Sequence, residues 1–251
     1  MSEPGLAHQR AYWDGWYADM ADRPARDLLH QRHLGLPDGW HANNTVPWWG
    51  IGEIGDLLGL GRGDVLLDLA CGRGAISVEL ARRAGGQVVG VDLSPVALRS
   101  ARAAARAGGV EAAYAAAPMA ATGLRSGFAD AAVCIDSAQF AGPGLGHELF
   151  RVLSPGAGVA LTCWRATRPD DPEVPAKIRD LDLRAQLEDA GFKQVSVTEP
   201  RHWEDAERAM WREAAALDPG EDHALRSMHE EGVRAVAREG RLRRVLISAR
   251  R

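Results

Sequence analysis

Two acidic residues and a pair of glycines stand where a parallel sheet would place a nucleotide-like ligand. Asp68, Gly72 and Gly74 occur in the stretch VLLDLACGRG (residues 65–74), and Asp92 ends the next apolar run, VVGVD. Glycines at a tight turn let a ligand approach the backbone closely, and the helix that follows presents free N–H groups. An acid at the end of the next strand can accept hydrogen bonds from both hydroxyls of a ribose. The pattern predicts a site for a nucleoside-containing cofactor.

Two classes of cofactor stay open on these residues. A nicotinamide dinucleotide site usually has the pattern GxGxxG, and here Ser77 stands at the third glycine position. Asp68 precedes the first glycine and is not part of the dinucleotide pattern. No GK[ST] follows the turn, so a P-loop is excluded. Neither a metal-ligand spacing nor a Ser–His–Asp order is evident, so we expect no bound metal and no covalent nucleophile.

The elements that must position these residues alternate between apolar runs and helical patterns. This alternation predicts a Rossmann-like, doubly wound α/β fold with a seven-stranded, mainly parallel sheet covered on both faces. One continuous helix is expected at 178–190, and the spacing leaves the direction of the last strand open. Strands are predicted at 64–69, 87–91, 110–116, 131–135, 159–164, 194–198 and 245–248.

The chain divides into a core and additions. Residues 1–60 are expected to form an N-terminal helical cap, 61–200 the cofactor-binding core, 201–240 a helical insertion and 241–251 the final strand of the core sheet. The arginines of this last segment are interpreted as the solvated face of an edge strand.

Tryptophan is concentrated outside the predicted core. Five of the eight tryptophans lie in residues 13–49, and none lies between residues 50 and 163. We interpret the additions as a cap that lines an apolar pocket for a second substrate, although aromatic residues at helical spacing more often pack in a core. The candidate substrate-binding residues are Trp48, Trp49, Gln139, Trp164 and Trp203.

The sequence assigns no catalytic base. His41 lies in a predicted loop and His147 follows the fourth predicted strand, so both are weak candidates. Gln139 is a third weak candidate, because its amide could orient an acceptor oxygen or nitrogen.

Composition excludes several classes of partner. The formal net charge of -4 disfavours tight binding to nucleic acid or to an anionic membrane. Three widely spaced cysteines favour reduced thiols and a cytoplasmic location. We see no signal peptide and no apolar run of the roughly 20 residues that a membrane span needs. We therefore expect a cytoplasmic monomer or homodimer that acts on a small molecule.

Four motifs together resemble one enzyme family. VLLDLACGRG, VVGVDLS, ADAAVCIDS and ELFRVLSPGAGVALT are similar, in order and spacing, to the successive motifs of class I S-adenosylmethionine-dependent methyltransferases across residues 62–199. The segment QRHLGLP…PWWGIGEI also resembles a group of small-molecule methyltransferases common in actinobacteria. The resemblance implies methyl transfer to a small, partly apolar metabolite, such as a secondary metabolite, at oxygen, nitrogen or carbon. A nicotinamide-dependent oxidoreductase and an inactive cofactor-binding protein remain the alternatives.

The resemblance also implies roles for individual residues. Asp68 would lie near the ammonium of the cofactor, Asp92 would hold the ribose, and Leu93 would pack on the adenine. Such proteins often have an acid near position 118 that bonds the adenine amino group, and Pro118 here leaves adenine recognition open. The implied cofactor-binding residues are Asp68, Ala70, Cys71, Gly72, Gly74, Asp92, Leu93, Pro118, Met119, Asp136 and Ser137.

Overall fold

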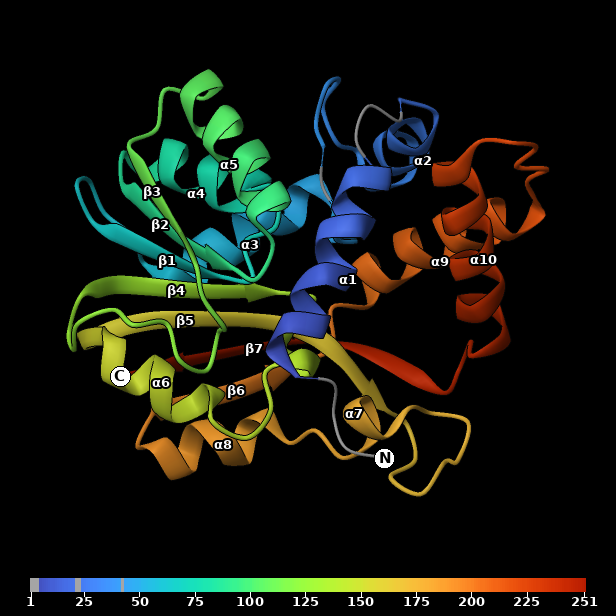
Figure 1. The fold of residues 1–251 in the computed structure, drawn as a ribbon. Helices are drawn as coiled ribbons and strands as arrows, with labels where there is room; N and C mark the ends of the chain where they lie inside the picture. Colours follow the sequence, from blue (N-terminus) through green and yellow to red (C-terminus); the bar gives the residue numbers. More distant parts are fainter. Residues whose placement is uncertain (1–4, 21–23, 42) are drawn as a thin grey trace.

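A seven-stranded sheet forms the centre of the structure, a computed structural model that describes residues 5–20, 24–41 and 43–251. The strand order is β3-β2-β1-β4-β5-β7-β6, and β7 runs opposite to the other six strands of this sheet (Figure 1). The predicted fold class is confirmed, and the direction that the spacing left open is antiparallel. The strands are β1 (Val65–Leu69), β2 (Gln87–Asp92), β3 (Ala112–Ala116), β4 (Ala129–Ile135), β5 (Leu153–Ala166), β6 (Lys193–Thr198) and β7 (Leu242–Arg250).

Helices cover both faces of the sheet, because the central strands are apolar on both sides. On one face α3 and α4 pack against Leu66 and Val133, and on the other α6 and α8 pack against Leu67 and Leu69. Burying such side chains contributes about 1.5–3 kcal/mol each. The helices that flank the sheet are α3 (Trp48–Leu58), α4 (Ala75–Ala84), α5 (Pro95–Ala107), α6 (Leu145–Val152) and α8 (Leu183–Ala190).

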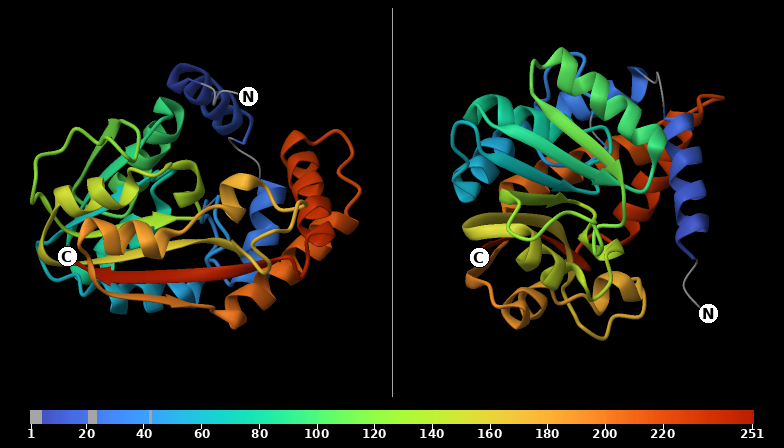
Figure 2. Two further views of the ribbon diagram at one scale, coloured as in Figure 1. Left: turned by 90° about the horizontal axis from the view of Figure 1, so that it is seen from below. Right: turned by 60° about the vertical axis from the view of Figure 1, so that its left-hand side comes forward.

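Segments from both ends of the chain pack together at one end of the sheet. Helix α2 (Pro24–Leu34) lies against α9 (Arg201–Ala216) and α10 (His223–Ala237), which project from that end in Figure 2. Leu34, Met210 and Met228 are buried in the core that these helices share. Helix α1 (Leu6–Asp19) packs instead on α5. The predicted cap segments therefore meet, while the division into domains stays a prediction.

Two sequence predictions about elements were wrong. The single helix expected at 178–190 is two helices, α7 (Ala176–Arg179) and α8, because the Asp182 carboxylate caps a new helix by accepting a 2.9 Å hydrogen bond from the Ala185 N–H. The last strand is also not an edge strand, because β7 lies between β5 and β6. An arginine of this strand, such as Arg244, can therefore be buried.

The parallel strands carry their carboxyl ends toward α1, α9 and α10 (Figure 1). Two non-glycine residues with left-handed backbone lie at these ends, Ala70 after β1 (φ 55°) and Asp136 after β4 (φ 54°). Such conformations cost about 1–3 kcal/mol each and cluster at functional sites. None of the helices in the described ranges is long and apolar enough to cross a membrane.

Candidate active site

The turn after β1 is fastened to the end of β2. The Asp92 carboxylate accepts a 2.9 Å hydrogen bond from the Gly72 N–H and a 2.8 Å bond from the Ser94 N–H. The Cys71 N–H donates to the Val91 carbonyl at 3.0 Å. These bonds hold the glycine turn and the β2 carboxylate in one fixed arrangement.

The two glycines of this turn leave no room for side chains. Gly72 has φ +52°, and a Cβ there would lie 2.6 Å from the Tyr17 hydroxyl. Gly74 has φ +75°, and a Cβ there would lie 3.0 Å from the Cβ of Ala101. The left-handed backbone favours glycine at both positions. The close approach of Tyr17 shows that the backbone here is open to a neighbouring group.

A buried carboxylate faces this turn. Asp68, on β1, is 5% exposed, and no ion pair joins it to a cation of the described residues. Burial raises its pKa to about 7, the Ser77 hydroxyl lowers it, and the nearby Asp92 carboxylate raises it further. An acid in this state lacks a counter-ion and would gain one from a cationic ligand.

These residues line a small cavity of about 60 Å³ at the carboxyl end of β1. We call it the small cavity. Helix α1 covers it, because Asp14 accepts a 2.6 Å hydrogen bond from the Ser94 hydroxyl and Tyr17 points at Gly72. Burial raises the pKa of Tyr17, and the Asp92 carboxylate raises it further. The lining residues are Tyr17, His41, Asn43, Asn44, Asp68, Ala70, Cys71, Gly72, Arg73, Gly74, Ala75, Ile76, Ile135 and Ser137.

A buried charge network lies beyond the end of β4. The Arg244 guanidinium, from β7, is fully buried and donates to the Asp136 carboxylate at 2.6 Å and to the Glu207 carboxylate at 3.0 Å. Asp136 also accepts hydrogen bonds from the Thr162 hydroxyl at 2.6 Å and the Thr45 N–H at 3.0 Å. One cation thus joins β4, β7 and α9.

The network fixes the ionisation of its two acids in different ways. Burial alone would raise the pKa of Asp136, but Arg244 and the surrounding donors hold it below its usual range. For Glu207 burial prevails and raises the pKa, with Arg244 offsetting part of the rise. Glu207 is therefore the more easily protonated member of the pair.

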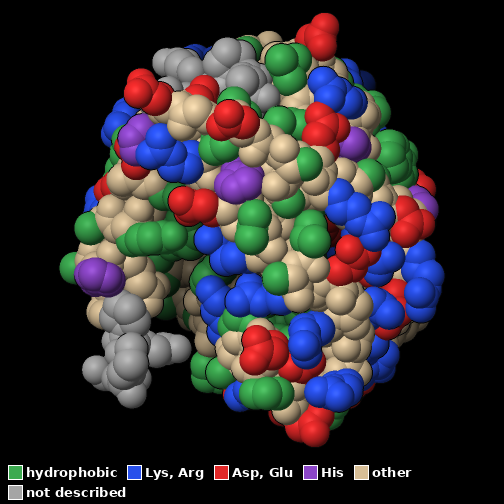
Figure 3. Space-filling model, turned by 90° about the vertical axis from the view of Figure 1, so that its right-hand side faces the viewer, with side chains coloured by type: hydrophobic (Ala, Val, Ile, Leu, Met, Phe, Trp, Pro, Cys, Tyr) green, Lys and Arg blue, Asp and Glu red, His purple; other side chains and the backbone are tan. Residues whose placement is uncertain are grey.

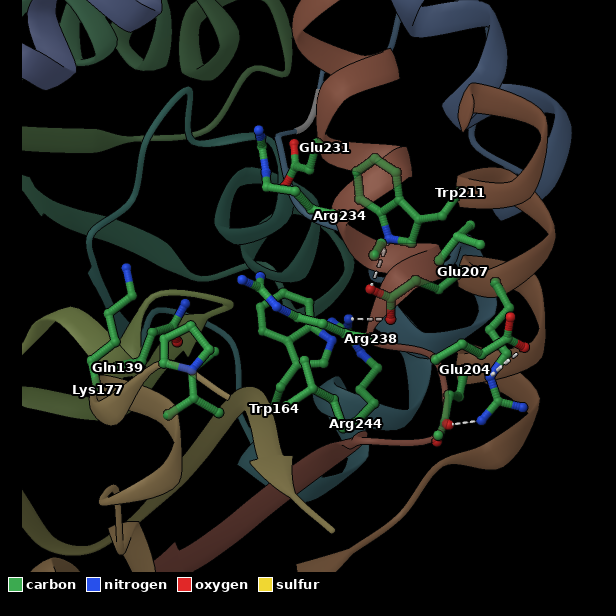
Figure 4. Close-up of a pocket in the computed structure, with 18 of the residues that line it drawn as sticks. Gln139, Trp164, Lys177, Glu204, Glu207, Trp211, Glu231, Arg234, Arg238 and Arg244 are labelled. Atoms are coloured by element: carbon green, nitrogen blue, oxygen red, sulfur yellow. Dashed lines mark hydrogen bonds and ion pairs between the residues drawn. The ribbon is translucent and has the colours of Figure 1, made fainter. Parts of the chain in front are cut away.

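A larger cavity of about 320 Å³ opens beside this network. We call it the large cavity. In Figure 4, Lys177 and Gln139 stand on one side of it, Glu207 and Trp211 on the other, and Arg238 between them. Figure 3 shows Lys and Arg side chains gathered beside a hollow on this face. Among its lining residues are Gln139, Phe140, Trp164, Lys177, Glu204, Glu207, Arg208, Trp211, Glu231, Arg234, Arg238, Glu239 and Arg244.

The two cavities flank one short segment. Ser137 lines the small cavity, while Gln139 and Phe140, in η1 (Ala138–Phe140), line the large one. The Gln139 amide N–H donates to the Asp136 carbonyl at 2.9 Å, and its side-chain oxygen is buried with no hydrogen-bond partner in the described part of the chain. An unpartnered buried acceptor costs about 1–3 kcal/mol, so this oxygen is ready to bind a donor.

Comparison with known families decides the identity of the core. Residues 66–156 match the family described as a methyltransferase domain. This match places a methyltransferase domain at residues 66–156. The matched residues run from β1 to the first part of β5 and include the glycine turn, Asp92 and Asp136.

Curated proteins that are similar to this chain include uncharacterized mycobacterial ones. The uncharacterized protein Rv1403c of Mycobacterium tuberculosis is 33% identical over 176 residues, and the match covers 64% of this chain and 62% of the relative. The uncharacterized protein Mb1438c of Mycobacterium bovis matches to the same extent. The chain thus spans less than two thirds of the length of these relatives.

Solved structures share the fold of the methyltransferase domain at low sequence identity. A phosphoethanolamine N-methyltransferase of Haemonchus contortus, in complex with phosphomonomethylethanolamine and S-adenosylhomocysteine, has a TM-score of 0.72 at 17% identity, covering 94% of this chain and 59% of that chain. A geranyl diphosphate C-methyltransferase of Streptomyces coelicolor has a TM-score of 0.66 at 17% identity, covering 92% and 98%.

The structure gathers about half of the predicted cofactor residues of the methyltransferase domain around the small cavity. Those that line it are Asp68, Ala70, Cys71, Gly72, Gly74 and Ser137. Asp92 lies directly behind the turn, and Met119 packs toward the core, with its sulfur 3.8 Å from the Cys134 thiol. Leu93 and Pro118 are half-buried and line neither cavity. Asp136 is held by Arg244 instead of facing the small cavity.

Of the predicted acceptor residues, Trp164 and Gln139 line the large cavity. Trp203 does not, because its indole is fully buried against Gly50 and donates to the Glu53 carboxylate at 3.2 Å. Trp48 packs edge-on against Trp40. Trp49 is 44% exposed and lines neither cavity. The full burial of Trp203 assigns its indole to packing between α3 and α9, whereas a substrate role for Trp48 and Trp49 stays a prediction.

The two candidate histidines lie apart. His41 lines the small cavity, and its Nδ1 lies 2.7 Å from the Asp27 carboxylate. His147 is exposed on α6 and lines neither cavity, so its candidacy has no geometric basis.

Sequence reasoning missed three functional candidates, namely Tyr17, Glu207 and Arg244. The aromatic stripe of α1 was visible in the sequence, but its contact with Gly72 was not. Glu207 and Arg244 gave no signal, because a charged residue on an amphipathic helix or strand is usually solvated. Among the described residues no cluster of His, Cys, Asp and Glu could hold a metal ion.

Proposed function

We propose that the chain catalyses methyl transfer from S-adenosylmethionine to a small, partly apolar acceptor. One observation carries the proposal: Asp68, a buried carboxylate that has no cationic partner among the described residues, lines the cavity beside the glycine turn of a methyltransferase domain. A cofactor that carries an ammonium and a sulfonium supplies the missing positive charge.

The residues of the small cavity fit such a cofactor. Asp68 would pair with its ammonium, and Gly72 and Gly74 would let its chain pass close to the backbone. Asp92, already held by two N–H donors, would use its remaining lone pairs for the ribose hydroxyls. When bound, this cofactor supplies a methyl group on a positively charged sulfur.

Binding requires space that Tyr17 now fills. A cavity of about 60 Å³ is well below the roughly 300–1,000 Å³ typical of small-molecule sites. We propose that the Tyr17 side chain leaves Gly72 as the cofactor enters. Helix α1 would then close over the bound molecule and exclude water, which favours transfer over hydrolysis.

The large cavity is the proposed acceptor site. Trp164 and Phe140 offer apolar contacts, and the unpartnered oxygen of Gln139 would accept a hydrogen bond from the acceptor. Direct displacement requires the acceptor atom to contact the methyl group with no side chain between them. An acceptor held beside Gln139 would therefore reach past η1 toward Ser137, where the segment that lines both cavities meets the cofactor. Alignment of this kind is the main contribution that a protein makes to a direct displacement.

Calorimetry with S-adenosylmethionine, S-adenosylhomocysteine and NAD tests the cofactor. We expect binding of the first two and none of NAD. The Asp68→Asn variant should lose S-adenosylmethionine binding, while Asp56→Asn, an exposed acid on α3, should keep it. Binding of NAD alone would support the oxidoreductase and reject this proposal.

Transfer of a labelled methyl group to a pool of small metabolites tests the enzyme. Label in a product separated from the cofactor would support methyl transfer, and mass spectrometry of that product would identify the acceptor atom. Cofactor binding without transfer to any of the metabolites would favour an inactive binding protein.

We also propose that the protein is a cytoplasmic monomer or homodimer and that its acceptor is a secondary metabolite. Its three cysteines are buried and free, which suits a reducing compartment. Sedimentation of the purified chain measures the oligomeric state directly.

A further inference from the structure

Three of the four acids that line the large cavity are paired with arginines. Glu207 is paired with Arg244, as described above. Glu204 forms ion pairs with Arg208 and, at 3.5 Å, with Arg243. Glu239 is paired with Arg212 and lies 3.8 Å from Arg208. These carboxylates therefore contribute little net negative charge to the space between them.

Two cations of the same cavity have no such partner. Lys177 on α7 and Arg238 at the end of α10 line the cavity, and within the described ranges no ion pair or side-chain hydrogen bond involves either of them. The Lys177 ammonium lies 4.1 Å from the centre of the Phe140 ring. Partial burial lowers the pKa of Lys177, and the Arg238 charge lowers it further. Two like charges that face one space repel each other unless an anion enters it.

We propose that Lys177 and Arg238 bind a carboxylate or phosphate group of the molecule that occupies the large cavity. This inference rests on the proposed function in one respect, because it takes that molecule to be the methyl acceptor. The guanidinium binds either oxyanion through paired N–H donors, and the ammonium adds a point charge. The acceptor is then a small anion with an apolar body.

The residues that line the large cavity suggest where the apolar body and the charged group of this anion would lie. Phe140 and Trp164 would hold the apolar body near Gln139, and Lys177 beside Phe140 would hold the charged group. An aromatic acid or an aromatic phosphate matches this spacing of apolar and cationic groups. A neutral or cationic molecule of the same shape would leave both cations unpaired and should bind more weakly.

Four probes with one ring and different charges test the site. We would titrate the full chain by calorimetry with benzoate, phenyl phosphate, benzyl alcohol and benzylamine, at low salt and in the presence of S-adenosylhomocysteine. We expect one or both anions to bind at least about tenfold more tightly than the neutral and cationic probes. The two anionic arms distinguish a carboxylate from a phosphate.

Variants of the two cations test whether they bind the anionic group. Lys177→Gln and Arg238→Gln should each weaken anion binding about tenfold, and the double variant about a hundredfold. Arg179→Gln is the control, since Arg179 lies on the same short helix but is paired with Asp180 at 2.8 Å. Melting temperatures report whether each variant is folded. Equal binding of all four probes, or anion affinities unchanged in a folded double variant, would overturn the proposal.

The two proposals fail separately. A chain that binds S-adenosylmethionine but does not discriminate between the probes rejects the anion site and leaves the methyltransferase proposal intact. A chain that binds benzoate through Lys177 and Arg238 but no S-adenosylmethionine rejects the proposed function and leaves the anion site intact.

Discussion

The two cavities of this protein are opposite in charge and in origin. Among the described residues, the small cavity contains a carboxylate without a counter-ion, Asp68, and most of its wall comes from one stretch, residues 68–76. The large cavity contains cations without counter-ions in the same described part of the chain, Lys177 and Arg238, and its wall comes from η1, β5, α7, α9, α10 and β7. This contrast supports our proposals that the small cavity binds a cationic ligand and the large cavity an anionic one.

On our two proposals, the cationic cofactor and the anionic acceptor bind in neighbouring but separate cavities. Each cavity repels the charge that the other attracts, so neither ligand competes for the wrong site. The segment from Asp136 to Phe140 is the shared wall of the two cavities. Arg244 holds this segment through its hydrogen bond to the Asp136 carboxylate. Variants at the shared wall and at the charged residues test whether these features act independently.

Removing the support of the shared wall should have the largest effect. In Arg244→Gln, Asp136 and Glu207 lose their buried cation, so we expect a loss of about 3–5 kcal/mol in the free energy of unfolding, measured by urea denaturation. Arg243→Gln, which removes a partly exposed cation one residue away, should cost less than about 1 kcal/mol. Similar losses in both variants would show that the network does not support the wall.

Variants of two tryptophans should distinguish an indole that stabilises the fold from one that binds the acceptor. Trp203→Ala removes a fully buried indole and should lower the free energy of unfolding by about 3–5 kcal/mol. Trp164→Ala, at the wall of the large cavity, should cost less stability and raise the acceptor KM more than the cofactor Kd. If Trp203→Ala stays stable but loses acceptor binding, our placement of the large cavity is wrong.

Asp68→Asn should weaken cofactor binding about a hundredfold and stabilise the free protein. Ionised Asp68 is penalised by burial, and its pKa rises from 3.8 unfolded to about 7 folded. The penalty is absent below pH 4, grows as pH rises and is complete above pH 7. At pH 8 we therefore expect Asn to raise the free energy of unfolding by a few kcal/mol.

Thermal melts from pH 4 to pH 8 check this prediction. The difference between Asp68→Asn and the wild type should increase with pH and level off near pH 7 to 8. A constant difference across this range would place the pKa of Asp68 elsewhere.

The pH dependence of cofactor binding should be the most gradual of these effects. A cationic ligand binds the ionised form of Asp68, so affinity should fall about tenfold for each pH unit below 7 and be constant above it. Calorimetry at pH 5, 6, 7 and 8 measures the slope. Anion binding in the large cavity should not follow this profile, which sharpens the contrast between the two sites.

The same contrast shows what a sequence can predict. The glycine turn, Asp68 and Asp92 belong to consecutive strand–helix units, so their proximity follows from the pattern of a parallel sheet. Arg244 looked like a solvated edge residue because its strand follows a long helical segment. Its burial depends on Asp136 and Glu207, which are distant in sequence, and on the insertion of β7 between β5 and β6.

The positions of Trp203 and Lys177 could not be predicted from the sequence for a related reason. A tryptophan near a predicted strand end is as compatible with a pocket as with a core, and only the contact with Gly50 decides between them. Lys177 lies in a short helix that the sequence pattern merged with the next one. Its value as an anion ligand depends on Arg238, which a different helix supplies.

The position of β7 also sets an order of assembly. Strand β6 pairs only with β7, so during synthesis β6 emerges before the strand that can hold it in the sheet. The glycine turn and β1 to β4 need no residue beyond β5 for their pairing. Nascent chains should therefore complete the cofactor half early and acquire Arg244, and with it the shared wall, as the last step of folding.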